Sequence, residues 1–111
     1  MYILFRDHNV ITCIYSVFNI NVRSVYQLTT LAVPHLIKTK GNIVNVSSVC
    51  GLRSFPGCLA YCMSKSAVDQ LTRCVALELA SHQVRVKIMF SFFNGLISFF
   101  NIILRRVLLF V

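Results

Sequence analysis

Hydrophobic positions recur every three or four residues along two stretches of the chain, which is the spacing of one face of an α-helix. The first stretch covers residues 18–37 and the second covers residues 60–80. Pro34 is expected to kink or finish the first helix, and residues 38–41 supply the cations and the glycine that commonly end one. In the second helix the predicted core-facing stripe consists of Met63, Ala67, Leu71, Val75 and Leu79.

Two short runs rich in β-branched residues follow these helices: 42–46 predicts a buried strand, and 84–88 predicts another strand. Residues 47–58 have the glycines and proline of a loop. On the second helix, Asp69 and Arg73 lie four residues apart and could pair on the outer face. The alternation of helix and strand is typical of α/β folds, in which right-handed crossovers join parallel strands.

The two ends of the chain depart from this pattern. Residues 1–17 are apolar without a strong period, and residues 88–104 carry no charge before Arg105 and Arg106. Seventeen such residues are at the lower limit for a membrane span, and arginines commonly lie at a bilayer surface. One interpretation is therefore a non-catalytic protein, membrane-associated or interacting, that is anchored by residues 88–111.

Composition narrows the class of protein. The net charge of +8 arises from only three acidic residues, and the bases are scattered, without the basic stripe of a nucleic-acid binder. The five cysteines show neither a CxxC pair nor the spacing of a metal site. We expect free thiols in a reducing, cytoplasmic compartment, with no metal and no nucleic acid bound.

Four polar residues stand at positions where they could perform chemistry. Tyr61 and Lys65 are four residues apart, Ser48 precedes Tyr61 by 13, and Asn21 precedes Ser48 by 27. Taken singly, each has an ordinary interpretation as a helix aromatic, a solvated cation, a turn cap or a polar helix flank. Together, a cation one turn from a phenol lowers the tyrosine pKa from about 10, which suits a general acid and base.

The stretch from Gly41 to Ile88 contains GNIVNVSS, AYCMSKSAVDQLTR, ALELA and VRV in that order. With Asn21, these motifs resemble the short-chain dehydrogenases/reductases, in particular the 3-oxoacyl-reductase-like branch. The resemblance extends back to Phe18. It implies an α/β, partial Rossmann-type NAD(P)-binding fold: the C-terminal half of a parallel sheet with two long helices, followed here by a hydrophobic helical tail.

The same resemblance implies an NAD(P)(H)-dependent oxidoreductase that interconverts a small alcohol and a carbonyl compound. Tyr61 would be the acid and base, and Lys65 would tune it, with both residues contacting the cofactor. Ser48 would stabilise the substrate oxygen, and Asn21, at a helix distortion, would hold a water of a proton relay. Family members commonly form homo-oligomers through their two long helices, here residues 18–37 and 60–80.

The sequence departs from the family before and after this stretch. The glycine-rich turn that receives the cofactor pyrophosphate is absent, so nothing chooses between NAD and NADP. Lys87 stands where the family has asparagine, and Ser91 and Phe92 stand where it has Pro-Gly. We therefore expect a truncated chain that lacks much of the cofactor-binding energy, divided into an atypical segment (1–17), a partial catalytic domain (18–88) and a hydrophobic tail (89–111).

Overall fold

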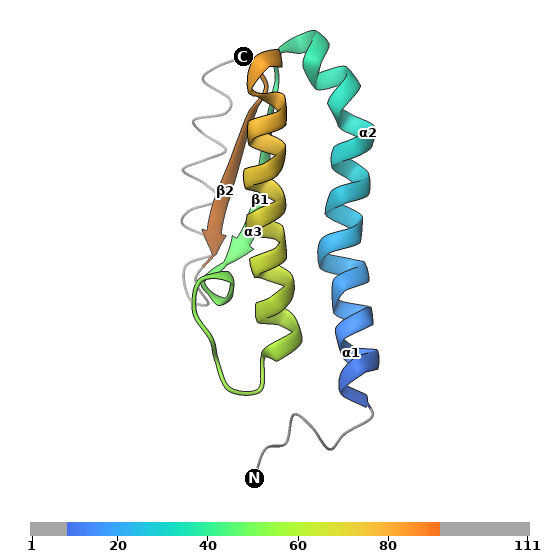
Figure 1. Cartoon of the computed structure of the whole chain (residues 1–111), viewed down its shortest axis with the longest axis vertical. Helices are drawn as coiled ribbons and strands as arrows, with labels where there is room; N and C mark the ends of the chain where they lie inside the picture. Colours follow the sequence, from blue (N-terminus) through green and yellow to red (C-terminus); the bar gives the residue numbers. More distant parts are fainter. Residues whose placement is uncertain (1–8, 92–111) are drawn as a thin grey trace.

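A computed structural model describes residues 9–91, in which two parallel strands are covered on one face by helices (Figure 1). Most of the expected tail, and with it the expected membrane anchor, lies outside the described residues. The elements, in chain order, are α1 (Asn9–Phe18), the π-helical turn η2 (Asn19–Arg23), α2 (Ser24–Thr39), β1 (Asn42–Ser48), the 3₁₀ turn η3 (Val49–Gly51), α3 (Leu59–Leu79), the 3₁₀ turn η4 (Ala80–His82) and β2 (Arg85–Ser91).

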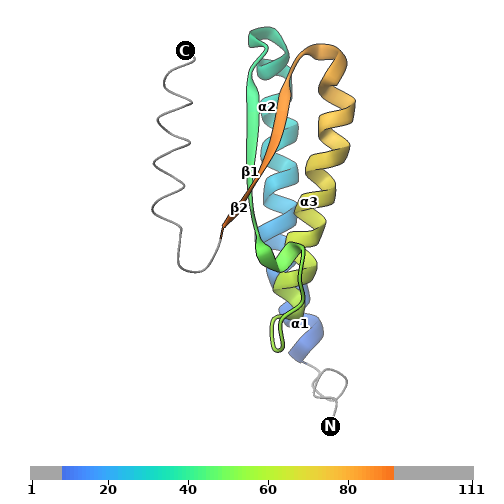
Figure 2. The ribbon, with the colours of Figure 1, turned by 90° about the vertical axis from the view of Figure 1, so that its left-hand side faces the viewer.

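The strands β1 and β2 pair in parallel, with Asn42 opposite Arg85 and Ser48 opposite Ser91. This confirms the parallel arrangement expected from the helix–strand alternation. The expectation of a buried strand over 42–46 is wrong, because Val44 and Val46 of β1 are exposed. The reason is visible in Figure 2, where the labelled helices all lie on one side of the sheet, so that no helix of residues 9–91 covers the other face of β1.

The first long helix begins earlier and ends later than its hydrophobic period predicted. It starts at Asn9, because the apolar residues of α1 continue the helical spacing and pack against α3. Pro34 lies inside α2 and does not finish it, since the helix continues to Thr39. Lys40 then adopts a left-handed conformation, with φ of 52°, and its N–H donates to the carbonyl of Leu36. The helix therefore ends within the predicted segment 38–41, although the left-handed residue is Lys40 rather than Gly41.

The buried face of α3 differs from the predicted stripe. Met63 is exposed, and Leu79 is the only member of that stripe that is buried. Asp69 is also buried, so the expected pair with Arg73 on the outer face is wrong, and Arg73 instead donates to Gln70. The cause is that α3 packs against the sheet and η3 through small polar groups as well as apolar ones. The buried residues of α3 are Ser64, Val68, Asp69, Thr72 and Leu79.

Candidate active site

The candidate residues gather around the carboxyl end of β1 and the first half of α3. Ser48 is the last residue of β1, and only 4% of it is exposed. Its hydroxyl oxygen accepts a hydrogen bond from the backbone N–H of Cys50 at 3.2 Å, so it does cap the turn η3. Because this oxygen acts as the acceptor in that bond, the hydroxyl proton remains available for donation to another oxygen.

Tyr61 and Lys65 lie one turn apart near the start of α3. The Lys65 Nζ lies 5.6 Å from the centroid of the Tyr61 ring, which is within the range of a cation–π contact. Tyr61 is 38% exposed. In the part of the chain that the structure describes, its hydroxyl has no protein hydrogen-bond partner, so it can face a ligand from solvent.

Lys65 is fastened to the strand that carries Ser48. Its Nζ donates to the carbonyl of Val46 at 3.1 Å, and the Ser47 hydroxyl donates to the Lys65 carbonyl at 3.5 Å. Burial of the ammonium lowers the pKa of Lys65 below its ordinary value of 10.5, and the negative charge of Asp69 opposes that shift. The partly buried lysine is thus held in a defined position beside the tyrosine.

Asn21 lies in the π-helical turn η2, so the helix distortion expected from the family resemblance is present. Turns of this kind widen a helix by one residue and often occur at functional sites. The Asn21 Nδ2 donates to the Ser64 hydroxyl at 3.0 Å, and that hydroxyl donates to the Tyr61 carbonyl at 2.8 Å. The structure therefore ties Asn21 to the helical turn that carries Tyr61. Among the described residues, no hydrogen bond joins Asn21 to Lys65 directly.

Sequence reasoning missed two buried polar residues of α3 that lie beside this site. Ser64 is fully buried and joins η2 to α3. Asp69 is 1% exposed, and it was assigned to the wrong face of the helix. Both sit on the side of α3 where small or polar residues alternate with Val68. The signal in the sequence that could have found them is this recurrence of small or polar residues along one face of the helix.

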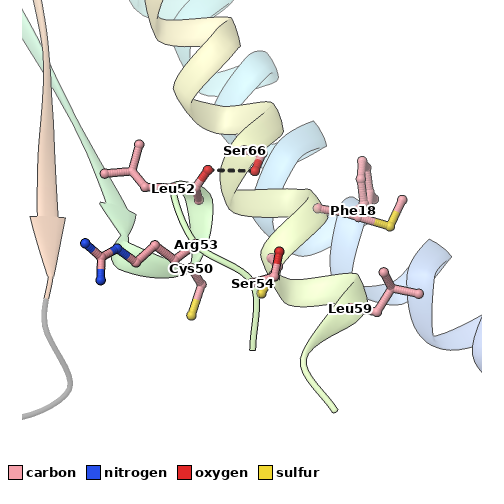
Figure 3. Close-up of a pocket in the computed structure, with 10 residues that line it drawn as sticks. Phe18, Cys50, Leu52, Arg53, Ser54, Leu59 and Ser66 are labelled. Atoms are coloured by element: carbon pink, nitrogen blue, oxygen red, sulfur yellow. Dashed lines mark hydrogen bonds between the residues drawn. The ribbon is translucent and has the colours of Figure 1, made fainter. Parts of the chain in front are cut away.

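A pocket of about 440 Å³ lies beside this site rather than at it. Its walls are the turn after β1, the start of α3 and Phe18 at the end of α1, as Figure 3 shows. The Ser66 hydroxyl donates to the Gly51 carbonyl at 2.8 Å and closes one side. Tyr61, Lys65 and Ser48 are not among its lining residues, so the pocket is a neighbour of the proton-transfer groups and does not contain them.

The cysteines of the described region are all unpaired, from Cys13 to Cys74. Within residues 9–91, no group of histidine, cysteine and acidic side chains has the geometry to hold a metal ion. No helix of the same region is both long enough and apolar enough to cross a membrane.

The family model for the short chain dehydrogenases matches residues 4–91. The chain belongs to the short-chain dehydrogenase family. This match confirms the expected family, and the α/β arrangement of helices over a parallel sheet confirms the expected partial fold. Members of the family are NAD(P)-dependent oxidoreductases that act on alcohols and carbonyl compounds.

Curated relatives include a reductase of the branch expected from the sequence. The chain is 43% identical over 72 residues to a 3-oxoacyl-(acyl-carrier-protein) reductase of Thermotoga maritima, covering 64% of this chain and 29% of that protein. It is 41% identical over 71 residues to carbonyl reductase (NADPH) 2 of Sus scrofa, covering 62% and 29%. This short-chain dehydrogenase thus spans less than a third of the curated relatives it matches.

A solved structure of a short-chain dehydrogenase of Caenorhabditis elegans, determined with its cofactor, is similar with a TM-score of 0.69 and 38% identity. The match covers 72% of this chain and 30% of that one. Other similar solved structures hold NAD+ in one case and NADPH in another. The solved structures that this chain resembles therefore include holders of either nicotinamide cofactor.

Proposed function

We propose that this chain forms the proton-transfer half of an NAD(P)(H)-dependent oxidoreductase site that interconverts a small alcohol and a carbonyl compound. The observation that carries the proposal is the placement of Lys65. Its ammonium is fastened to the carbonyl of Val46 at 3.1 Å and lies 5.6 Å from the centroid of the Tyr61 ring. A fixed cation beside a partly exposed phenol is what a tyrosine needs to exchange a proton.

Tyr61 is the general acid in reduction and the general base in oxidation. Tyr61 is 38% exposed, so its hydroxyl can reach a substrate oxygen. The Ser48 hydroxyl donates a hydrogen bond to the substrate oxygen, because its own oxygen already accepts the hydrogen bond from the Cys50 N–H. That donor stabilises the negative charge that develops on the oxygen as the carbonyl is reduced.

The chemistry of the donors fits a nicotinamide cofactor, which when bound supplies or accepts the hydride. The Lys65 ammonium has three N–H donors, and one of them binds Val46. Its other two N–H donors suit a pair of ribose hydroxyls. The partly exposed Tyr61 hydroxyl suits the same ribose. Asn21 is held in η2 by Ser64, where its carbonyl oxygen can bind a water between α3 and solvent.

An assay of nicotinamide oxidation tests this proposal. Purified chain would be mixed with NADPH or NADH and a pool of small ketones and aldehydes, and absorbance at the reduced nicotinamide band followed. We expect slow turnover, because the glycine-rich element that binds the pyrophosphate is not in this sequence. Tyr61→Phe should lower the rate at least about 100-fold, as general acid–base catalysis contributes that much.

The matched control is Tyr26→Phe, which removes another exposed tyrosine hydroxyl, on α2. Its rate should equal that of the wild-type chain. A rate that survives Tyr61→Phe, or a wild-type chain without turnover at millimolar substrate, contradicts the proposal.

A further inference from the structure

Asp69 is a buried acidic side chain for which the proposed function has no use. It is 1% exposed, and neither of its carboxylate oxygens has a hydrogen-bond partner among the described residues. Removing an ionised carboxylate from water is costly when no donor replaces the lost hydration, unless a positive charge compensates.

The carboxylate is enclosed by the turn that follows Ser48. A Cβ atom on Gly51 would lie 2.6 Å from the Asp69 Oδ2, so only glycine lets the turn approach this closely. The Ser66 hydroxyl fastens the same turn by donating to the Gly51 carbonyl at 2.8 Å. Asp69 is therefore sealed between α3 and η3, where water does not screen its charge.

Lys65 lies one helical turn before Asp69 on α3. Lys65 Nζ binds the carbonyl of Val46 and makes no hydrogen bond to Asp69, so the two charges interact across a gap. Within residues 9–91, Asp69 is the one charged group that acts on the pKa of Lys65, which it raises against the effect of burial.

Other titratable groups lie on the described elements around α3, and none of them is a cause of the shift in the Lys65 pKa. The strand β1 carries none. Those on the remaining described elements that pack on α3, and on α3 itself, are Cys13, Tyr15, Arg23, Tyr26, His35, Lys38, Cys50, Tyr61, Cys62, Arg73, Cys74, Glu78, His82, Arg85 and Lys87.

We propose that Asp69 is a positioning residue of the site, the buried counter-charge that keeps Lys65 a cation beside Tyr61 while the Val46 carbonyl holds the partly buried ammonium in place. Its importance for catalysis rests on the proposed function. The charge pairing itself can be measured without any turnover. Gly51 contributes to this arrangement, because a residue without a side chain lets η3 pack directly over the Asp69 carboxylate.

The test is a titration of Lys65 by NMR in the full chain with carbon-13 in its lysine side chains. The chain has only four lysines, and Lys65→Arg identifies the resonance. Asp69→Asn keeps the shape of the side chain and removes its charge. We expect this variant to lower the pKa of Lys65 relative to the wild-type chain, because burial is then unopposed.

Glu78→Gln is the matched control, since it removes one exposed carboxylate from the same helix. Glu78 lies 13 residues beyond Lys65, which is about 20 Å along a helix and beyond the screening length of about 10 Å at 0.1 M salt. The Lys65 titration should be unchanged in this variant. Equal Lys65 titrations in Asp69→Asn and Glu78→Gln overturn the proposal.

A second measurement uses the unmutated chain and so does not depend on the variant folding. Asp7 and Asp69 are the only aspartates, so carbon-13 at the aspartate carboxyl gives two resonances. An Asp69 carboxyl that is protonated at pH 7 overturns the proposal, and an ionised one supports it. If the chain proves inactive while Asp69→Asn still lowers the pKa of Lys65, the proposed function fails and the charge pairing stands.

Discussion

At the scale of single residues, the direction of each hydrogen bond determines what the side chain can still do. Ser48 uses an oxygen lone pair to cap η3 and keeps its proton. Lys65 donates one of its three N–H groups to the Val46 carbonyl, which leaves two for other acceptors. The structural and chemical interpretations of these residues, which are alternatives when judged from sequence, are therefore compatible in the folded chain.

The lowered pKa of Lys65 predicts a pH dependence of stability. The folded chain binds this proton less tightly than the unfolded chain does, so between the two pKa values the unfolded state holds more protons. Stability should therefore rise with pH as it passes the folded pKa of Lys65, and stop rising near the ordinary value of 10.5. Below that window the burial of the charged lysine is a constant cost.

Lys65→Met removes the charge and retains most of the side-chain volume. The difference in thermal unfolding between this variant and the wild-type chain, measured from pH 7 to 11, isolates the contribution of Lys65. We expect the wild-type chain to gain relative to the variant as the pH rises. A difference that is flat across this range would show that Lys65 has an ordinary pKa in the folded chain.

At the scale of elements, the π-helical turn η2 is joined to α3 by one side-chain hydrogen bond, from Asn21 to Ser64. Asn21→Ala leaves the fully buried Ser64 oxygen without this donor. The Ser64 hydroxyl keeps its own bond to the Tyr61 carbonyl. We therefore expect the variant to unfold more easily by about 0.5–1.5 kcal/mol, the net contribution of one hydrogen bond. Chemical denaturation of the purified chain measures this difference.

Asn19→Ala is the control for that variant, because Asn19 lies in the same turn and its amide oxygen accepts only an exposed bond from Arg23. Its effect should stay within about 0.5 kcal/mol, as is usual for surface substitutions. If both variants unfold alike, the bond between Asn21 and Ser64 does not hold η2 in place.

Hydrophobic periodicity was sufficient to predict α3, both strands and their parallel pairing. These elements have local signals: an apolar repeat of three and four residues in the helix and β-branched runs in the strands. The distortion at Asn21 was expected only through the family resemblance. Nothing in residues 19–23 alone distinguishes a π-helical turn from ordinary helix, since the partner Ser64 lies 43 residues away.

The remaining errors share a physical cause, which is that burial depends on neighbours that the local sequence does not contain. Asp69 was placed on the outer face because charged residues are rarely buried. Its burial depends on Gly51 and η3, which cover it. The early start of the first helix at Asn9 likewise reflects the packing of α1 on α3.

At the scale of the whole molecule, large apolar side chains remain exposed on the long helices. Leu28 and Leu31 on α2 and Leu77 on α3 are each more than 60% exposed. Exposed apolar surface of this kind often marks an interface. We expect a second copy of the chain to cover the long helices, as the family resemblance implies.

Leu28→Asp tests this expectation by light scattering after size-exclusion chromatography. The wild-type chain should elute as a dimer or larger, and the variant should have a lower mass. Gln27→Asp, an adjacent exposed position that receives the same charge, should leave the mass unchanged. A monomeric wild-type chain would contradict the expected oligomer.

Binding of reduced nicotinamide cofactor, followed by its fluorescence, tests the central claim about Tyr61 and Lys65 most directly. Lys65→Ala should weaken the binding of NADH or NADPH about 10- to 100-fold, the loss expected for a charged hydrogen-bond donor. Tyr61→Phe loses only a neutral hydroxyl and should weaken the binding by less than about 10-fold. Lys38→Ala, which removes an exposed lysine from α2, should leave the affinity nearly unchanged. Equal affinity in the wild-type chain and Lys65→Ala, or no binding to the wild-type chain at millimolar cofactor, would contradict the account.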